Sequence, residues 1–275
     1  MTLQAYAKQE GKLKVSNRQE LLSYLLDSYQ KKTPHSKKLA SDSRPILADK
    51  SSIGLRFNQE TKEICYPVCV DRASGSQLVD VDNNNYTDVL MGLGTHLFGH
   101  QPDFIKDAIN NQLSNGFAIG PQHPIVGETA ALVSELTGLQ RVSFSNTGTE
   151  AVMTAIRIAR SAHQGQKIAI FTNSYHGHMD SALVRAPISE YARIKLLNKL
   201  GNPKLLKTVL DKFSRFKAVP AFPGVSKATA KESIVLEYGN KRSLDILKNN
   251  HKQLAAVLVE PVQSRMPELQ PAEFL

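Results

Sequence analysis

Residues 143–160, SFSNTGTEAVMTAIRIAR, contain the pattern in this chain that is best suited to binding an anion. The spacing predicts a strand that ends at Ser145, a tight turn and a helix that opens at Thr149. The free N–H groups and the positive dipole end of a helix N-terminus bind anions. Gly148 permits close backbone approach, and the hydroxyls of Thr147 and Thr149 can donate to phosphate oxygens. The alternative interpretation is an ordinary strand–helix turn in which Thr147 or Thr149 caps the helix.

Residues 173–183, NSYHGHMDSAL, directly follow the apolar run KIAIF, which is typical of a buried parallel strand. The carboxyl ends of such strands border the ligand crevice of an open α/β sheet. Tyr175 offers a flat face to an aromatic ligand, and His176 offers a group that titrates near neutral pH. His176, His178 and Asp180 could also suggest a metal, but no later cluster of ligands completes a coordination shell. A turn in which His178 packs internally is the structural alternative.

Residues 254–265, LAAVLVEPVQSR, predict a second buried strand that delivers Glu260 at its end. A carboxylate in that position is costly unless it meets a cation or a hydrogen-bond donor. Pro261 ends the strand, and Gln263 and Arg265 are expected to face the same crevice. An ordinary carboxylate at the surface end of a strand is the alternative.

Residues 92–102, GLGTHLFGHQP, form a glycine-rich loop at the expected junction between two domains, where loops often border a site. We expect His96 and His100 in this loop to be structural rather than catalytic.

The first third of the chain predicts one helix, a linker and a small antiparallel meander. Residues 16–30 combine capping-box spacing with leucines at helical intervals, and a polar, basic linker follows as far as Pro45. The runs ICYPVCV, SQLVDV and NYTDVLM are short, β-rich and divided by turn residues. Cys65 and Cys69 lie within or beside the first run, where we interpret them as small buried hydrophobes.

The remaining chain predicts a doubly wound α/β architecture, because helical and strand-like runs alternate. Two amphipathic helices are expected after Pro102, the second one ending at Gly138 as its C-cap. Residues 188–237 are basic and poorly patterned and are interpreted as an insertion over the sheet. We therefore expect an N-terminal segment over residues 1–102 and a large domain over residues 103–275.

Composition restricts the class of protein further. The chain has 275 residues, 41 % hydrophobic and 21 % charged, so a packed core is expected and general disorder is excluded. No apolar run is long enough to cross a bilayer, and two cysteines alone favour the reducing cytoplasm over a secreted disulfide scaffold. The net charge of +9 is diffuse and has no nucleic-acid-binding motif beside it, so no specific nucleic-acid partner is expected.

Taken together, these segments resemble the class-III aminotransferases, which are fold-type-I enzymes that depend on pyridoxal 5'-phosphate. The matching passages are DVDNNNYTD, GLGTHLFGHQP, SNTGTEA, SYHGH and VEPVQ, and the similarity runs from about residue 37 to residue 275. The subgroup that the sequence is most similar to comprises the glutamate-1-semialdehyde aminomutase-like domains of polyketide/peptide synthetases of the microcystin and mycosubtilin kind. Asn83 stands where the family usually has glycine, and asparagine tolerates a positive φ there.

The resemblance implies a fold-type-I α/β domain, here a partial three-layer sheet preceded by the N-terminal helix and meander, with a cofactor site at the ends of the strands. It implies that the cofactor phosphate is held by Thr147, Gly148 and Thr149. It also implies that three residues lie beside the pyridine ring or the substrate amine: Tyr175, His176 and Glu260.

The resemblance also implies what reaction to expect. The family moves an amino group from an amino acid to a keto or aldehyde acceptor, and the subgroup suggests a carrier-bound β-keto acyl chain in secondary metabolism. The aspartate that pairs with the pyridine nitrogen and the Schiff-base lysine are expected beyond Leu275, so no catalytic residue is assigned within the chain. We expect a homodimer that shows little turnover from these residues alone. A non-catalytic remnant that at most binds phosphate compounds is the alternative.

Overall fold

The computed structural model describes residues 18–48, 59–117, 120–187 and 218–275. They belong to two compact units, Met1–Gln122 and His123–Leu275. The N-terminal unit therefore extends to Gln122 and includes a helix that lies beyond residue 102, where the sequence suggested a boundary. No helix among the described residues is long and apolar enough to cross a membrane.

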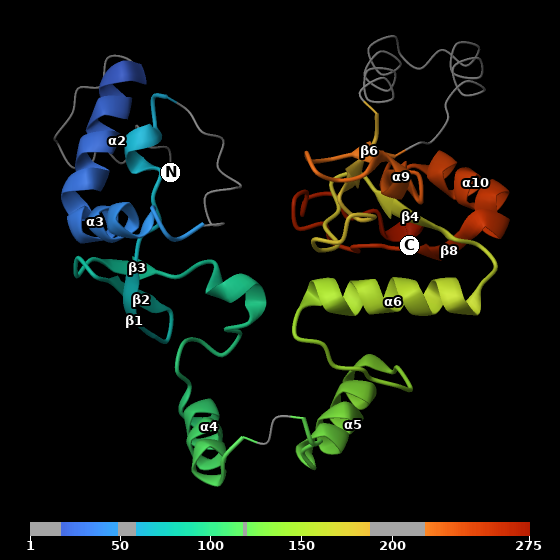
Figure 1. The fold of residues 1–275 in the computed structure, drawn as a ribbon, viewed down its shortest axis with the longest axis horizontal. Coiled ribbons are helices and arrows are strands. Elements are labelled where there is room, and N and C mark those ends of the chain that lie inside the picture. The colour runs from blue at the N-terminus through green and yellow to red at the C-terminus, as the bar shows by residue number, and fades with distance from the viewer. Residues whose placement is uncertain (1–17, 49–58, 118–119, 188–217) are drawn as a thin grey trace. The chain divides into compact units, whose positions relative to one another are not determined.

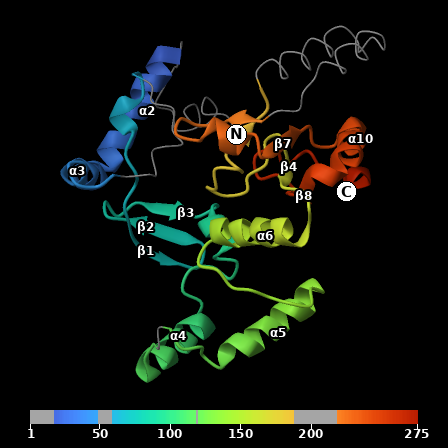
Figure 2. The same ribbon diagram turned by 45° about the vertical axis from the view of Figure 1, so that its right-hand side comes forward.

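The first unit contains two consecutive helices, a three-stranded antiparallel sheet in the order β1-β2-β3 and one further α-helix. Figure 2 shows the small sheet as a meander, as the sequence predicted. Its elements are α2 (Arg18–Lys32), α3 (Pro34–Ser43), η1 (Lys62–Ile64), β1 (Val70–Ser74), β2 (Gln77–Asp80), β3 (Asn85–Thr87), η2 (Met91–Gly94) and α4 (Asp103–Asn115).

The basic linker predicted after the first helix is instead largely helical, because α3 occupies its centre. Pro34 is the first residue of α3, a position where its fixed φ favours a helix and its missing N–H costs nothing. Thr33 separates the two helices, and its hydroxyl contacts the carbonyl oxygen of Tyr29 at 2.7 Å and the hydroxyl of Tyr66 at 2.8 Å. A contact between residues far apart in the sequence thus fixes the junction of two helices in a segment whose polar composition predicted a linker. The capping residue expected for the first helix, Ser16, lies outside the described residues.

The first strand begins later than the sequence predicted, at Val70 rather than within ICYPVCV. Pro67 cannot donate to a strand ladder, and η1 occupies the start of the predicted run. Cys65 and Cys69 are consequently only partly buried, so the interpretation as buried hydrophobes is wrong in degree. Asn83 adopts a φ of 62°, which confirms that asparagine supports the turn between β2 and β3.

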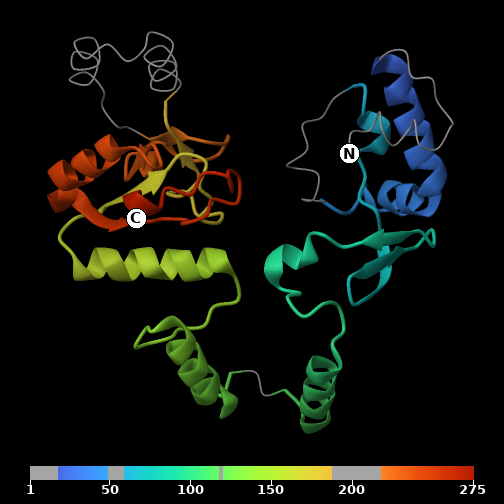
Figure 3. The same cartoon turned by 180° about the vertical axis from the view of Figure 1, so that it is seen from behind.

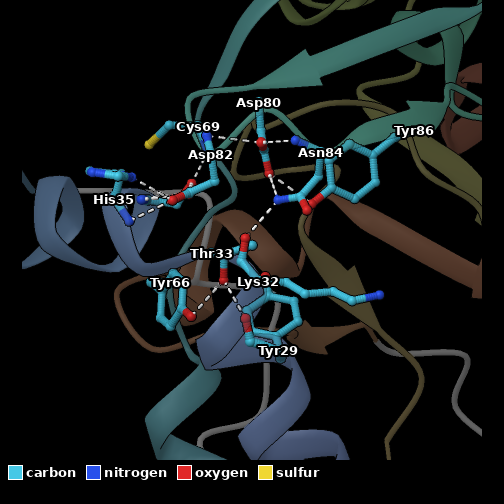
Figure 4. Close-up of polar contacts among 11 residues, drawn as sticks. Tyr29, Lys32, Thr33, His35, Tyr66, Cys69, Asp80, Asp82, Asn84 and Tyr86 are labelled. Atoms are coloured by element: carbon cyan, nitrogen blue, oxygen red, sulfur yellow. Dashed lines mark hydrogen bonds and ion pairs between the residues drawn. The ribbon is translucent and has the colours of Figure 1, made fainter.

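A polar network joins the start of α3 to the meander (Figure 4). The side chain of Asp80 accepts hydrogen bonds of 2.8–2.9 Å from the N–H groups of Asp82 and Asn84, the amide of Asn84 and the hydroxyl of Tyr86. Asp82 in turn accepts hydrogen bonds from the N–H groups of His35 and Ser36 at the start of α3. Asp80 therefore fixes the turn between β2 and β3, and Asp82 fixes the start of α3 against that turn.

The second unit is built on a parallel sheet in the order β7-β4-β8, with a separate two-stranded antiparallel pair, β5-β6. Its elements are α5 (Ile125–Thr137), α6 (Gly148–Ala162), β4 (Lys167–Phe171), β5 (Val184–Arg185), β6 (Val219–Pro220), α9 (Lys227–Ala230), β7 (Ser233–Leu236), α10 (Lys241–Asn250), η3 (His251–Gln253), β8 (Leu254–Val257) and η4 (Ala272–Phe274).

Alternate side chains of the central strand β4 point to opposite faces of the sheet, as the period of a strand requires. Ile168 and Ile170 pack with Ile156 of α6 on one face. Ala169 and Phe171 belong to a second cluster, against which Ile246 of α10 packs. Helix, sheet and helix thus form three layers (Figures 1 and 3), and the prediction of an α/β layered sheet domain is confirmed.

Three sequence-based expectations are wrong in this unit. The run RVSFS, predicted as a strand ending at Ser145, is irregular, because its backbone has no strand partner in the described part of the chain. Ser233–Leu236, placed in an insertion, is the fully buried strand β7, whereas residues 188–217 of that insertion lie outside the described residues. The strand β8 ends at Val257, before Glu260. By contrast, Gly138 ends α5 with a φ of 71°, as expected.

Candidate cofactor-binding site

Helix α6 supplies the anion-binding end of the site. The helix begins at Gly148 with Thr147 as its N-cap, so the alternative interpretation of Thr147 as a capping residue is correct. The Thr147 hydroxyl accepts the Glu150 N–H at 3.2 Å, and the Glu150 carboxylate accepts the Thr147 N–H at 3.0 Å. Since Thr147 N–H is thereby occupied, an anion has the N–H groups of Gly148 and Thr149 and the two threonine O–H groups at its disposal.

The loop after β4 packs directly against this helix end. The N–H group of His178 donates to the Thr149 hydroxyl oxygen at 3.1 Å. At Gly177, where φ is +86°, a Cβ atom would lie 2.6 Å from Thr149 Oγ1 and 3.0 Å from Thr149 Cα. The side chain of His178 is exposed, so it does not pack internally. Glycine at position 177 is therefore what lets the loop lie on the first turn of α6.

The loop after β8 holds the other side of the same segment. Glu260 accepts the N–H group of Tyr175 at 3.1 Å and that of Ser264 at 2.8 Å. The amide of Gln263, only 1 % exposed, donates to the carbonyl oxygen of Thr172 at 2.9 Å. The guanidinium carbon of Arg265 lies 5.8 Å from the centre of the Tyr175 ring. Hydrogen bonds of Glu260 and Gln263 thus position residues 172–175, although the strand itself ends earlier than predicted.

Electrostatics favour an ionised Glu260 and a neutral His176. Burial by itself would raise the pKa of Glu260, but hydrogen bonds from Ser264 and Tyr175 outweigh it and hold the pKa below its ordinary value. Burial lowers the pKa of His176, and the charge of Glu260 opposes this only in part. The Nε2 atom of His176 and the Oε1 atom of Gln263 are buried and without a hydrogen-bond partner among the described residues.

The structure brings the six predicted site residues into one connected region. Tyr175 is 46 % exposed, so one large aromatic face is available to a ligand. Buried polar atoms without a partner mark places where a bound group can supply a donor or acceptor. The region thus fits an aromatic phosphate. Among the described residues, no three metal-ligating side chains gather, and His176, His178 and Asp180 form no such group.

Two residues that matter to this geometry were not assigned to the site from the sequence. Gln263 was expected at the crevice mouth but is buried as a link between two loops. Gly177 had no role of its own beyond the SYHGH motif, although Thr149, which it contacts in the structure, was predicted to hold the phosphate. The glycine between the two histidines could have predicted this packing, because a close approach of the backbone to another element requires glycine.

His96 and His100 lie in the first unit, where their rings contact each other. His100 Nε2 contacts an Asp88 carboxylate oxygen at 2.7 Å, and the rings of His96 and His100 lie 4.3 Å apart between centroids. Asp88 also accepts the N–H groups of Leu90 and Met91, and these contacts hold its pKa below its ordinary value.

Solved structures with this fold include a transaminase with PLP bound and a glutamate-1-semialdehyde aminomutase in complex with PMP. A transaminase solved with PLP bound is 25 % identical, with a TM-score of 0.69 over 88 % of this chain and 51 % of its own. A glutamate-1-semialdehyde aminomutase from Pseudomonas aeruginosa PAO1 has the same fold, with a TM-score of 0.72, 21 % identity and 93 % and 51 % of the two chains covered. The chain accordingly has part of the fold of the fold-type-I aminotransferases.

The sequence matches the class-III aminotransferase family over residues 57–273. The glutamate-1-semialdehyde 2,1-aminomutase of Methylacidiphilum infernorum is 33 % identical over 210 residues, which are 76 % of this chain and 43 % of the relative. The enzyme of that name from Ignicoccus hospitalis is also 33 % identical, over 76 % of this chain and 44 % of its own. The chain therefore belongs to the class-III aminotransferase family, and it spans less than half the length of these relatives. Family membership indicates pyridoxal phosphate as the cofactor.

The neutral state of the partly buried His176 has a consequence for stability. Because its pKa in the folded protein is lowered from 6.5, its contribution is complete above pH 6.5 and is lost as the pH falls further. We expect the free energy of unfolding to decrease below that pH, and His176→Gln to reduce this decrease. Urea unfolding at pH values on either side of 6.5 measures it, with His178→Gln, at an exposed position nearby, as the control. Equal pH dependence in all three proteins would contradict the assignment.

Proposed function

We propose that residues 123–275 bind pyridoxal phosphate as one part of a transaminase-type active site. The observation that carries this proposal is the convergence of the α6 N-terminus with the exposed ring of Tyr175 and the carboxylate of Glu260. When bound, the cofactor supplies an electron sink that makes an amino group transferable.

Each residue then has a defined role. The N–H groups of Gly148 and Thr149 and the hydroxyls of Thr147 and Thr149 bind the phosphate dianion, which the helix dipole also stabilises. Tyr175 stacks on the pyridine ring, and its position is fixed because Glu260 accepts its backbone N–H. Glu260 stays ionised, so its carboxylate can accept a hydrogen bond from a substrate ammonium group or from the ring's phenolic edge.

His176 completes the proposed arrangement. Its neutral ring brings a buried nitrogen, Nε2, that can accept or donate a hydrogen bond next to the cofactor. A positively charged imidazolium there would be disfavoured by the same burial that lowers its pKa.

We further propose an amino acid as donor and a keto or aldehyde compound as acceptor, with a carrier-bound β-keto acyl chain as the acceptor that the subgroup resemblance suggests. A cytoplasmic homodimer is part of the same proposal. The 275 residues on their own are expected to bind cofactor without rapid amino transfer, because none of their lysines matches the reactive lysine of the family.

Binding of the phosphate and of the ring can be tested separately. We expect the chain to bind pyridoxal phosphate about tenfold or more tightly than pyridoxal, a difference of about 1.4 kcal/mol or more. Tyr175→Ala should weaken pyridoxal phosphate by about three- to tenfold, since a stacked ring pair contributes roughly 0.5–1.5 kcal/mol beyond burial. Tyr175→Phe keeps the ring and should bind like the wild type. Titrations followed by absorbance measure these affinities for the wild type and both variants. Equal affinity of the wild type for pyridoxal phosphate and pyridoxal would contradict the phosphate site.

A further inference from the structure

We propose that Arg265 is a specificity-determining residue that binds the carboxylate of the amino acid substrate. This inference rests on the proposed function, because it places the substrate beside the cofactor ring on Tyr175. It adds a charged contact to a site in which the other residues hold the cofactor.

The position of Arg265 is defined by the loop that bears it. Ser264, the residue before it, is held by the Glu260 carboxylate at 2.8 Å. Gln263 is buried and anchored on Thr172 at 2.9 Å. With its backbone fixed on this side, Arg265 places its guanidinium carbon 5.8 Å from the centre of the Tyr175 ring. The same ring is the proposed platform for the cofactor, so Arg265 lies within reach of groups attached to it.

The charge of Arg265 is available to a ligand. The residue is exposed and forms no ion pair within the parts of the chain that the structure describes. Glu260 forms no ion pair with it, and both oxygens of that carboxylate accept backbone N–H groups instead. A guanidinium near an aromatic face keeps N–H groups at its edge, which match the two oxygens of a carboxylate.

The negative charge of Glu260 also favours a role for the Arg265 guanidinium in binding a substrate carboxylate. The ionised Glu260 lies beside the backbone of Tyr175, and a substrate carboxylate placed near it would be repelled. A guanidinium over the same ring offsets that repulsion. The cofactor phosphate has a separate set of donors at the α6 N-terminus, so a carboxylate is the anion left for Arg265 to bind.

The test compares stable ligands that differ in one carboxylate. N-Phosphopyridoxyl-L-alanine carries the carboxylate, N-phosphopyridoxyl-ethylamine lacks it, and pyridoxamine phosphate reports on the cofactor alone. We expect the wild-type chain to bind the alanine conjugate about tenfold or more tightly than the ethylamine conjugate, as for one charge-assisted bidentate contact. Arg265→Met should remove this preference while changing the affinity for pyridoxamine phosphate by less than about twofold. Arg265→Lys should restore part of the preference, and Arg185→Met, at an exposed position of β5, should keep it in full.

The outcomes separate the two proposals. If wild-type protein fails to bind pyridoxamine phosphate, the proposed function fails, and this inference fails with it. If pyridoxamine phosphate binds but the two conjugates bind equally, only the role of Arg265 is overturned. The role is also overturned if Arg265→Met weakens all three ligands by the same factor, because the guanidinium would then contact the phosphate. Isothermal titration calorimetry on the full 275-residue chain and its variants gives all of these affinities.

Discussion

Replacing Gly177 by alanine is expected to cause the largest loss of cofactor affinity and stability in the second unit. An alanine with a φ of +86° is strained by about 1–2 kcal/mol. Its Cβ atom would also lie 3.0 Å from Thr149 Cα, a backbone atom of α6 that cannot turn away. Overpacking of this kind costs roughly 1–3 kcal/mol more. The loop must then move off the helix end, so we expect pyridoxal phosphate affinity to fall about tenfold or more.

A matched control separates strain from overpacking. Gly224 has a φ of +95°, and no atom lies within 4 Å of the position that a Cβ atom would take there, so Gly224→Ala introduces the backbone strain without the clash. Urea unfolding and cofactor titration of both variants measure the difference. If Gly177→Ala proves no more damaging than Gly224→Ala, the loop does not depend on close approach to Thr149.

Replacing Asp80 by asparagine is expected to destabilise the first unit by about 2–4 kcal/mol, because it leaves buried donors without an acceptor. The Asp80 side chain is 1 % exposed, and each of its oxygens accepts two hydrogen bonds. In asparagine, one of those oxygens becomes an NH2 group that faces two other donors. Asp71→Asn is the control, since that carboxylate is exposed and its ion pair with Arg72 contributes little. Urea unfolding followed by circular dichroism compares them, and similar midpoints for the two variants would contradict a structural role for the network.

The same network predicts how the first unit responds to pH. Burial would raise the pKa of Asp80, but its hydrogen bonds hold the pKa below 3.8, so its stabilisation is complete above pH 3.8 and is lost on acidification. Burial and the Asp80 carboxylate raise the pKa of Tyr86 to about 12 from 10.0. Because the neutral phenol is favoured in the folded state, its contribution is complete below pH 10 and is lost as the pH rises towards 12.

The local elements of the site could be predicted from the sequence because neighbouring residues determine them. The run KIAIF is a central strand because every side chain in it is apolar or partly buried, and both faces of a parallel sheet are covered. The turn SNTGTEA leads into a helix because Thr147 and Glu150 satisfy each other's backbone N–H groups at capping-box spacing. The antiparallel meander and the C-cap at Gly138 follow from turn residues in the same way.

Contacts between distant segments decided the rest. RVSFS has strand-like composition but no partner in the described residues, whereas the short run Ser233–Leu236 is a strand because it pairs with β4. Thr33, at the junction of α2 and α3, contacts Tyr66, and no local pattern predicts a contact between residues that lie 33 positions apart.

The sequence by itself determined which residues of this protein can bind a phosphate, an aromatic ring and an amine, because side-chain chemistry and helix capping are local properties. The tertiary structure alone decided that Gly177 lies on Thr149, that Gln263 is buried and that Arg265 lies near Tyr175. The contacts of Gln263 and Arg265 join the loops that follow β4 and β8, two parallel strands separated by more than eighty residues, and the pairing of these strands brings the loops together. The contact of Gly177 joins the loop after β4 to the first turn of α6.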